Sequence, residues 1–328
     1  MAPLLKIENL VTSFYIEEGK VESVRSVNLE IARGETVALV GESGCGKSVT
    51  ALSVMRLVPT PPGRYESGRI VFNDREILKL SEEEMRDIRG NDIGMIFQEP
   101  MTSLNPIFTI GDQIIEAIVL HQNKTEAEAR RLAIELLDRV RIPSPEQRID
   151  QYPHELSGGM KQRVMIAIAI SCRPALLIAD EPTTALDVTI EAQILDVLAN
   201  LRDETQMSIL LITHNLGIVA QFADRVAVMY AGKIVEEAPV VELFEDPKHP
   251  YTRGLLRSLP KDEPGKLLET IPGTVPNPVN LPSGCAFHPR CPDVMDECRR
   301  EIPPVYRTGP NQTAACYLYK TNAVAQES

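Results

Sequence analysis

An eight-residue stretch near the N-terminus carries the residue types of a phosphate-binding loop. It is Gly41-Glu42-Ser43-Gly44-Cys45-Gly46-Lys47-Ser48, which fits the pattern G-x-x-x-x-G-K-[ST]. In such a loop the glycines let backbone N–H groups converge on phosphate oxygens, and the lysine neutralises the β- and γ-phosphates. The hydroxyl of Ser48 is placed to bind Mg²⁺. These residues therefore predict a nucleotide site.

The sequence on either side predicts the elements that position this loop. Residues 35–40 are typical of a buried strand running into the loop, and residues 48–57 are typical of a helix. The N-terminus of a helix favours an anion because its N–H groups are free. Since the pattern stands in a strand–loop–helix context, a chance match is a poor explanation. The predicted nucleotide contacts are Gly41, Ser43, Gly44, Cys45, Gly46, Lys47, Ser48 and Val49.

Two acids stand at the end of another apolar run. Residues 176–179 predict a buried strand, and Asp180 and Glu181 follow at once. Acids at a strand end are often only solvated, but with a phosphate-binding loop upstream the functional interpretation is stronger. Asp180 would then hold Mg²⁺. Glu181 would accept a proton from the attacking water.

Polar residues also end two further predicted strands. Residues 93–97 lead to Gln98, and residues 208–213 lead to His214. Ligands of open α/β sheets bind at the carboxyl ends of the strands. A solvated glutamine and a structural histidine are the alternatives at these positions. Together with the two acids, however, four polar groups are predicted to converge on one sheet edge.

A second candidate anion site lies in residues 156–163, L-S-G-G-M-K-Q-R. Ser157, followed by two glycines, would begin a helix with exposed N–H groups. A plain helix cap explains the same residues, and the cap geometry alone favours that alternative.

The rest of the first 258 residues completes an α/β pattern. An aromatic residue after the first strand, Phe14 or Tyr15, would stack on a base or, as is more common, belong to the core. Strands are predicted at residues 6–10, 21–31 and 67–72, a hairpin at 225–237, helices at 111–121, 125–140 and 189–205, and a capping box at Ser81 that begins a short helix.

Composition and charge exclude several classes of protein. The length of 328 residues predicts about two domains. The net charge of −12 gives no electrostatic support for a nucleic-acid partner. No apolar run approaches the roughly 20 residues that span a bilayer, and the N-terminus lacks the features of a signal peptide. The expected location is the cytosol or the cytosolic side of a membrane.

The C-terminal part is rich in proline and cysteine. We place a domain boundary near residue 259, which gives domains of residues 1–258 and 259–328. In a reducing compartment, clustered cysteines indicate a metal site before a disulfide. Zinc is the common choice, but the spacing is not the C-x₂₋₄-C of common zinc sites, and four thiolates also suit a [4Fe–4S] cluster. The four candidate ligands are Cys285, Cys291, Cys298 and Cys316.

Taken together, these motifs resemble the ATP-binding subunits of ABC transporters. The segment 156–163 is similar to the ABC signature, and the resemblance covers almost the full length. Three segments are similar to the D-type subunit of dipeptide/oligopeptide (Opp/Dpp) importers: residues 97–106, 249–252 and 284–292. The implied fold is a P-loop NTPase of the ABC type. It has a RecA-like core, antiparallel β and helical subdomains (the helical one about residues 95–171) and a loop-rich C-terminal extension.

The resemblance also implies roles that the residues alone leave open. Gln98 would contact Mg²⁺ and the attacking water, Glu181 would be the catalytic base, and His214 would hold the γ-phosphate. Tyr15 would stack on adenine, although the neighbouring Phe14 leaves the register open. The segment Ala185-Leu186-Asp187 would communicate across a dimer. The γ-phosphate held by the opposite subunit would be contacted by Ser157, Gly158 and Gly159.

The resemblance further implies partners and a cofactor. The resemblance implies a [4Fe–4S] cluster at the four cysteines, as in members of this importer class, with zinc as the alternative and unligated cysteines as the third possibility. The expected partners are a second, similar ATPase in a heterodimer, two permease subunits and an extracytoplasmic substrate-binding protein, at the cytoplasmic face of the membrane. Nickel or oligosaccharide importers use the same type of ATPase. A soluble ABC ATPase acting on DNA or ribosomes is the rival from another class.

Overall fold

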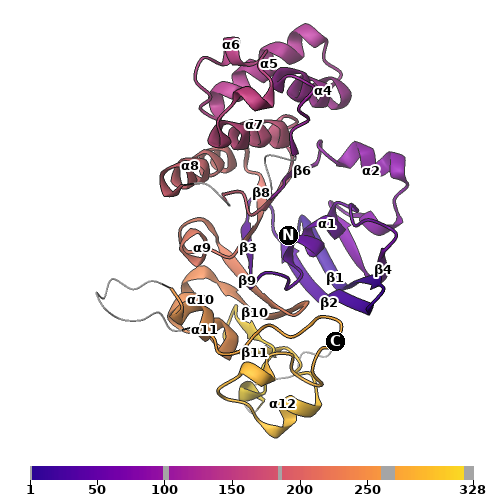
Figure 1. Cartoon of the computed structure of the whole chain (residues 1–328), viewed down its shortest axis with the longest axis vertical. Helices are drawn as coiled ribbons and strands as arrows, with labels where there is room; N and C mark the ends of the chain where they lie inside the picture. The colour runs from indigo at the N-terminus through magenta and orange to yellow at the C-terminus, as the bar shows by residue number, and fades with distance from the viewer. Residues whose placement is uncertain (1, 99–102, 184–186, 260–269, 321–328) are drawn as a thin grey trace. The chain divides into compact units, whose positions relative to one another are not determined.

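The computed structural model of the chain describes residues 2–98, 103–183, 187–259 and 270–320 (Figure 1). Two compact units divide the chain, and each combines segments that are far apart in the sequence. Unit 1 consists of Met1–Leu4, Ile31–Glu35 and Ile77–Ile212. Unit 2 consists of Leu5–Glu30, Thr36–Glu76 and Thr213–Ser328.

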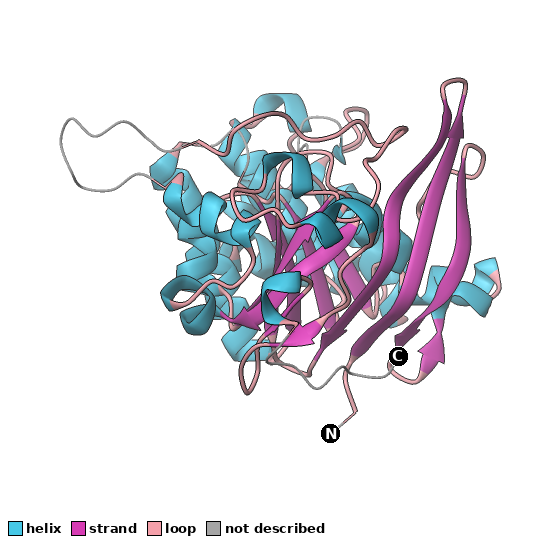
Figure 2. Cartoon of the chain, turned by 90° about the horizontal axis from the view of Figure 1, so that it is seen from below, coloured by secondary structure: helices cyan, strands magenta, loops and turns pink. Residues whose placement is uncertain are grey.

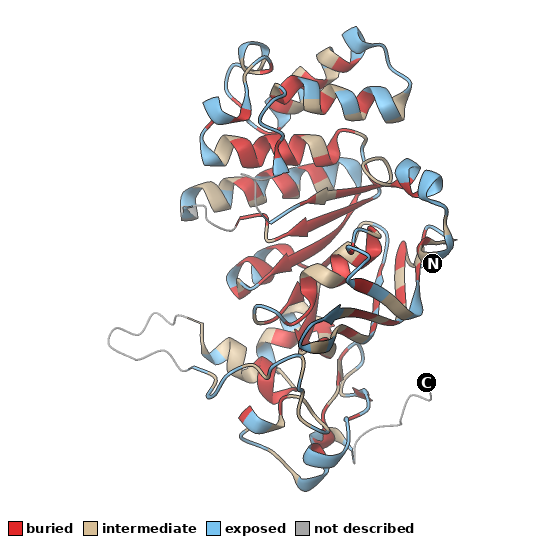
Figure 3. Cartoon of the chain, turned by 45° about the vertical axis from the view of Figure 1, so that its right-hand side comes forward, coloured by how far each residue is buried: buried red, intermediate tan, exposed pale blue. Residues whose placement is uncertain are grey.

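In the described part of unit 1, three parallel strands lie side by side. The central strand β7 (Leu176–Asp180) pairs with β6 (Ile93–Ile96) on one side and β8 (Ser208–Thr213) on the other. Every residue of β7 and β8 is buried (Figure 3), as is typical of parallel strands covered on both faces. Because the strands are parallel, the residues that follow β6 and β7 lie at the same edge.

The helices of unit 1 confirm the expected helical segments. Among the described residues of unit 1, three helices begin with a capping box, at Ser81, Thr109 and Thr125, and the sequence predicts the first of these. Helices α4, α5 and α7 pack on one another (Figure 1). The helices are α2 (Glu82–Ile88), α4 (Ile110–Gln122), α5 (Glu126–Arg139), α6 (Pro145–Arg148), α7 (Gly158–Ile170) and α8 (Val188–Thr205), with short 3₁₀ turns η1 (Ile77–Lys79) and η2 (Pro153–Glu155).

Unit 2 contains a mixed run of strands in the order β11-β12-β10-β9-β3. β3 (Thr36–Val40) runs parallel to β9 (Arg225–Tyr230), and β9 forms the expected hairpin with β10 (Lys233–Pro239). Two short strands of the C-terminal extension, β12 (Thr313–Ala314) and β11 (Tyr306–Arg307), continue this order beside β10. The extension is therefore hydrogen-bonded into the same sheet as the strand that leads to the phosphate-binding loop.

A second, antiparallel sheet of unit 2 has the order β2-β1-β4-β5, and its long strands are among those drawn in magenta in Figure 2. The strands are β1 (Leu5–Ile16), β2 (Gly19–Ile31), β4 (Gly63–Phe72) and β5 (Arg75–Glu76). β1 is longer than the predicted strand at residues 6–10. A register shift after Glu8 interrupts the apolar alternation, yet pairing with β4 continues to Phe14.

Unit 2 has an aromatic cluster in its core. Tyr230, Tyr251 and Phe287 are buried in one cluster, although they come from β9, from α11 and from the C-terminal extension. The helices are α1 (Lys47–Val54), α9 (Leu216–Phe222), α10 (Val240–Glu245), α11 (Pro250–Arg257) and α12 (Asp296–Arg300), with 3₁₀ turns η3 (His288–Arg290) and η4 (Tyr317–Tyr319). The domain boundary near residue 259 stays a prediction, and residues 260–269 lie outside the described part of the chain.

Candidate functional site

The phosphate-binding loop connects β3 to α1 in unit 2. The ammonium group of Lys47 lies inside the loop, where Nζ donates to the carbonyl oxygens of Gly41 at 2.8 Å and Glu42 at 3.1 Å. The Sγ atom of Cys45 is 3.8 Å from the same nitrogen. The loop thus carries a positive charge at its centre, which is the arrangement that phosphate binding requires.

Two glycines of this loop occupy positions that no side chain fits. A Cβ atom on Gly41 would lie 2.2 Å from the carbonyl oxygen of Met229, and one on Gly46 would lie 2.2 Å from that of Ser23. Gly46 also has a φ of 106° and caps α1, so it turns the chain into the helix. These two approaches explain why the pattern needs glycine at its first and sixth positions.

The other predicted loop residues occupy the same continuous turn. Ser43 and Gly44 are exposed, whereas Ser48 and Val49 are half-buried in the first turn of α1. Cys45 is buried, and burial raises the pKa of its thiol. The exposed part of the loop therefore lies where a ligand has access, and α1 begins directly behind it.

Unit 2 also contains the candidate adenine-stacking residues and His214. Tyr15 is exposed, and its hydroxyl donates to Oε1 of Glu66 at 2.6 Å, which raises the pKa of the tyrosine. The ring of Phe14 is half-buried beside Gly63. An exposed ring with a fixed hydroxyl is the better stacking surface of the two, so the burial favours Tyr15. His214 is exposed directly after β8.

Unit 1 brings together two of the predicted catalytic residues. The side-chain amide of Gln98 donates from Nε2 to Oε2 of Glu181 at 3.2 Å. Asp180, the last residue of β7, is buried, and Glu181 follows it with a φ of 47°. A left-handed backbone at a residue other than glycine costs about 1–3 kcal/mol and is concentrated at functional sites. The N–H of Glu181 donates to the carbonyl oxygen of Ile212 at 2.8 Å, which holds this turn in place.

The segment Ser157–Gly159 forms the exposed N-terminus of α7. The hydroxyl of Ser157 accepts the N–H of Met160 at 3.4 Å, so the expected helix cap is confirmed. A Cβ atom on Gly158 would meet nothing within 4 Å. The space in front of the first turn is therefore open to a ligand, and the cap and the anion site are compatible.

The body of α7 is fixed to the neighbourhood of Glu181. The buried amide of Gln162 donates to the carbonyl oxygen of Pro182 at 2.6 Å. Asp187 caps α8 by accepting the N–H of Ile190 at 2.9 Å, and Ile190 also lies against Gly159. Ala185 and Leu186 of the predicted dimer-contact segment, and residues 99–102 of the segment after Gln98, lie outside the described residues.

The four C-terminal cysteines line one small cavity of unit 2. Burial, with a contribution from the neighbouring thiols, raises the pKa of Cys291 to about 11 and that of Cys316 to about 12. Burial also raises the pKa of Cys285. A bound cation would reverse these shifts, because metals bind the thiolate. Within the described ranges, however, no three His, Cys, Asp or Glu side chains lie close enough together to hold a single metal ion.

Comparison with known proteins identifies the family. Residues 24–184 match the ABC transporter family, and residues 235–298 match the C-terminal region of oligopeptide/dipeptide transporters. The oligopeptide transport ATP-binding protein AppD of Bacillus subtilis (strain 168) is 51% identical over 99% of this chain and 100% of its own length. This chain is an ATP-binding subunit of the oligopeptide/dipeptide ABC transporter family.

Further relatives agree with this membership. The dipeptide transport ATP-binding protein DppD of Bacillus subtilis (strain 168) is 49% identical over 98% of this chain and 97% of its own length. Among solved structures, the dimeric ABC transporter cassette MJ0796 is similar with a TM-score of 0.65 and 27% identity, over 72% of this chain and 98% of that one. The ABC-type fold expected from the sequence is thereby confirmed, and the chain is an ATPase.

Several contacts of this ABC subunit had no counterpart in the sequence predictions. Glu42 of the phosphate-binding loop contacts Tyr251 and Arg290, and Glu236 contacts the segment before α11. The sequence singles out the motifs around Tyr251 and Arg290 only through their similarity to peptide importers, and it gives these two residues no chemical role.

Among the residues that the structure describes, no helix combines the length and the apolar character that a membrane crossing needs.

Proposed function

We propose that this chain hydrolyses ATP to power the import of dipeptides or oligopeptides through a membrane permease. The observation that carries the proposal is the near full-length similarity to peptide-import ATP-binding proteins, which includes the family's C-terminal region. The expected location is peripheral, at the cytoplasmic face of the cell membrane. The partners would be two permease subunits and an extracytoplasmic binding protein.

The chemistry is assigned to five residues. Lys47 would neutralise the β- and γ-phosphates, and Ser48 would bind Mg²⁺ with Asp180 and Gln98. Glu181 would accept the proton of the attacking water. Its hydrogen bond to Gln98 supports this assignment, because an amide donor holds the carboxylate in place. Magnesium would supply charge neutralisation at the phosphates.

The remaining site residues would act in recognition and in dimer formation. Tyr15 would stack on adenine, and His214 would hold the γ-phosphate. The exposed N-terminus of α7, Ser157 to Gly159, would contact ATP bound to a second ATPase subunit, and Asp187 would lie at that contact. The similar cassette MJ0796 is described as dimeric, which supports an ATP-bound dimer, here with a second, similar subunit.

Replacing the proposed base tests this mechanism. We expect Glu181→Gln to lower the rate of ATP hydrolysis by about a thousandfold or more, since general-base catalysis contributes on this order, and to trap an ATP-bound dimer. Steady-state hydrolysis and size-exclusion chromatography with ATP are the measurements. Glu204→Gln is the matched control, because Glu204 is an exposed acid of the same unit and forms a surface ion pair with Arg139, a kind of contact that contributes little. Unchanged hydrolysis in Glu181→Gln would contradict the assignment.

The cargo needs an experiment of its own. Nickel and oligosaccharide importers remain the alternatives, and the ATPase subunit would not contact the cargo. We expect the purified complex with its binding protein to hydrolyse ATP faster when di- or oligopeptides are added, and not when nickel or oligosaccharides are added. Stimulation by nickel or an oligosaccharide alone would assign the chain to that cargo instead.

We further propose that the four cysteines hold a [4Fe–4S] cluster, with zinc as the alternative. Their side chains line one cavity, and four thiolates are the usual ligand set of such a cluster. Iron and sulfide analysis of anaerobically purified protein is the test. Iron and sulfide in equal amounts are expected, and a colourless, zinc-loaded protein would contradict the cluster. The cluster would act as a structural staple of the extension.

A further inference from the structure

The C-terminal extension reaches the phosphate-binding loop at Glu42. Arg290, directly before Cys291, donates from its two terminal nitrogens to the two carboxylate oxygens of Glu42, at 2.7 Å and 3.0 Å. Both residues belong to unit 2, although 248 positions separate them. This is a bidentate, charge-assisted pair, the strongest form of hydrogen bonding between side chains.

The guanidinium of Arg290 is held from several sides. Its side chain is only 5% exposed, and its Nε donates to the carbonyl oxygen of Pro272 at 2.9 Å. The rings of Tyr230 and Phe287 lie 5.9 Å from the guanidinium carbon. Pairing with Glu42 raises the pKa of Arg290, so the arginine stays charged. The pair is therefore unlike an exposed ion pair, whose contribution is small.

The backbone of Glu42 has its own fixed partner. Its N–H donates to the hydroxyl of Tyr251 at 2.9 Å. Tyr251 is fully buried and packs against Tyr230 and Phe287, with ring centres 4.6 Å and 5.4 Å away. The position of Glu42 is thus set by side chains from α11 and from the extension.

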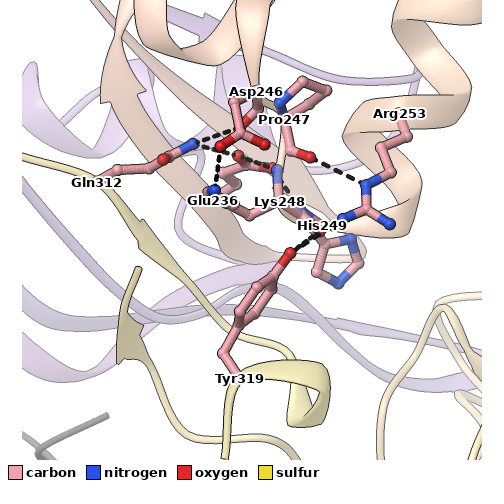
Figure 4. Close-up of polar contacts among 8 residues, drawn as sticks. All are labelled: Glu236, Asp246, Pro247, Lys248, His249, Arg253, Gln312 and Tyr319. Carbon is pink, nitrogen blue, oxygen red and sulfur yellow. Dashed lines mark hydrogen bonds and ion pairs between the residues drawn. The ribbon is translucent and has the colours of Figure 1, made fainter. Parts of the chain in front are cut away.

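A buried network holds the segment that carries Tyr251 (Figure 4). The carboxylate of Glu236 accepts the N–H groups of Lys248 and His249, each at 2.7 Å, and the amide of Gln312 at 3.1 Å. Tyr319 donates to the carbonyl oxygen of Lys248 at 2.9 Å. Gln312 and Tyr319 belong to the extension, so the extension supports the loop a second time through this segment.

These contacts bear on Lys47, the lysine of the phosphate-binding loop. The carbonyl oxygen of Glu42 is one of the groups that hold Nζ of Lys47. The N–H, the carbonyl and the carboxylate of Glu42 are therefore all engaged, and a shift of Glu42 would move a partner of Lys47. The loop pattern itself requires no acid at this position.

The charge of Glu42 makes Arg290 necessary. A carboxylate in a loop that binds a triphosphate would repel the ligand, and the pairing with Arg290 cancels that charge. We propose that Arg290 is a positioning residue for ATP binding: it fixes Glu42 and neutralises it, so that the extension controls the affinity of the phosphate-binding loop for nucleotide. This inference rests on the proposed assignment of residues 41–48 to ATP.

Titration of the full-length chain with Mg-ATP and Mg-ADP tests the inference. We expect Arg290→Met to weaken ATP binding by about 10- to 100-fold, the range for losing charge-assisted hydrogen bonds. The affinity for ATP should fall by more than the affinity for ADP, because the carboxylate of Glu42, no longer paired, repels the more highly charged ligand more strongly. In the complete transporter, KM for ATP should rise while kcat at saturating ATP stays within about twofold, because the substitution acts on binding rather than on the chemical step.

A second substitution separates positioning from mere folding. Glu42→Gln removes the charge, so the double variant Arg290→Met/Glu42→Gln should bind ATP at least about fivefold more tightly than Arg290→Met alone. Arg307→Met is the matched control, since Arg307 is an exposed arginine of the same extension that donates to nearby carbonyl groups of Gly309 and Pro310. Its affinity should not change.

Several outcomes would overturn the inference. Unchanged ATP affinity in Arg290→Met would do so, and so would a folded double variant as weak as the single one. If Arg290→Met fails to fold, Arg290→Lys replaces it as the test, because lysine keeps the charge but cannot form the bidentate pair. We expect this variant to bind ATP about three- to tenfold more weakly. Unchanged ATP binding would refute the positioning role of Arg290. Lys47→Ala tests the loop itself. If that variant binds ATP normally, the proposed function fails, whatever Arg290 does.

Discussion

Gly46 stands where backbone geometry and packing both exclude a side chain. Its φ of 106° lies in the left-handed region, and a Cβ atom would collide with the carbonyl oxygen of Ser23, a backbone atom of β2. A backbone neighbour cannot rotate away as a side chain can, so the strand itself would have to move. The need for glycine at position 46 therefore comes from the packing of the loop against β2 as well as from phosphate binding.

We therefore expect Gly46→Ala to destabilise the chain by about 2–3 kcal/mol and to abolish ATP binding. Chemical denaturation and nucleotide titration are the measurements. Gly309→Ala is the control, because a Cβ atom there would meet its nearest neighbour, Cβ of Gln312, at an ordinary 3.4 Å. A Gly46→Ala variant with the stability and affinity of the control would contradict this view of the loop.

The sequence predicts the role of a single residue when neighbouring residues in the sequence reveal that role. Lys47 and the loop glycines follow from an eight-residue pattern, and Asp180 and Glu181 from their place after a buried run. Arg290 carries no such signal. Its partner Glu42 is 248 residues away, and only the folded chain brings the two together. The hydrogen bond between Gln98 and Glu181 spans 83 residues, yet it was within reach because both follow strands of a parallel sheet.

Helix α7 connects the proposed dimer contact with the neighbourhood of the proposed catalytic base. Its exposed N-terminus, at Ser157, is the proposed contact for the nucleotide of a partner subunit, whereas Gln162, later in the same helix, is 2% exposed. The amide of Gln162 donates to the carbonyl oxygen of Pro182, directly after Glu181. A displacement of α7 would therefore also move Pro182, the residue next to the proposed catalytic base.

Gln162→Leu tests this connection. The substitution leaves a buried carbonyl group without its donor, which should cost about 1–3 kcal/mol of stability. Because the turn after Glu181 would shift, we expect hydrolysis to slow by about 10- to 100-fold while ATP affinity stays the same. Gln147→Leu, at an exposed glutamine of α6, should leave both quantities unchanged. Equal losses of rate and affinity in Gln162→Leu would argue against a connection to the base.

Elements with regular periodicity were predicted well, and their ends less well. The helices α4, α5 and α8 match the expected segments because their apolar residues recur at helical spacing. β1 extends six residues beyond the predicted strand because its register shift breaks the alternation that the prediction relies on. The short strands β11 and β12 have two residues each, too few to produce a pattern.

On the scale of the whole molecule, the C-terminal extension packs closely against the rest of unit 2. It adds β12 to the edge of β10, contributes Phe287 to the aromatic cluster and supplies Arg290 to the phosphate-binding loop. The proline-rich composition predicts a domain boundary near residue 259, and that boundary stays a prediction. Composition describes the local chain and carries no information on the contacts that the extension makes. The resemblance to the importer family identified the extension, but its packing required the structure.

The stability of the chain also depends on pH through His249, the residue that caps α11. Its Nδ1 accepts the N–H of Tyr251 at 3.1 Å, which requires a neutral ring, and complete burial lowers the pKa of His249 to about 3. The guanidinium of Arg253 adds to this shift. The depressed pKa means that the stabilisation is fully present above pH 6.5, the usual value for histidine, and is lost as the pH falls toward 3.

We expect the unsubstituted chain to lose about 1.5 kcal/mol of stability from this site between pH 6.5 and pH 5, and His249→Asn to lose none from it. Asparagine keeps an acceptor for the first turn of α11 but cannot gain a proton. Burial raises the pKa of the neighbouring Glu236, which acts in the opposite direction as the pH falls, but this residue is present in both chains and largely cancels in the difference. Denaturation curves at several pH values give that difference. His154→Asn, at an exposed histidine, should follow the unsubstituted chain, and parallel curves for His249→Asn would show that His249 does not titrate with unfolding.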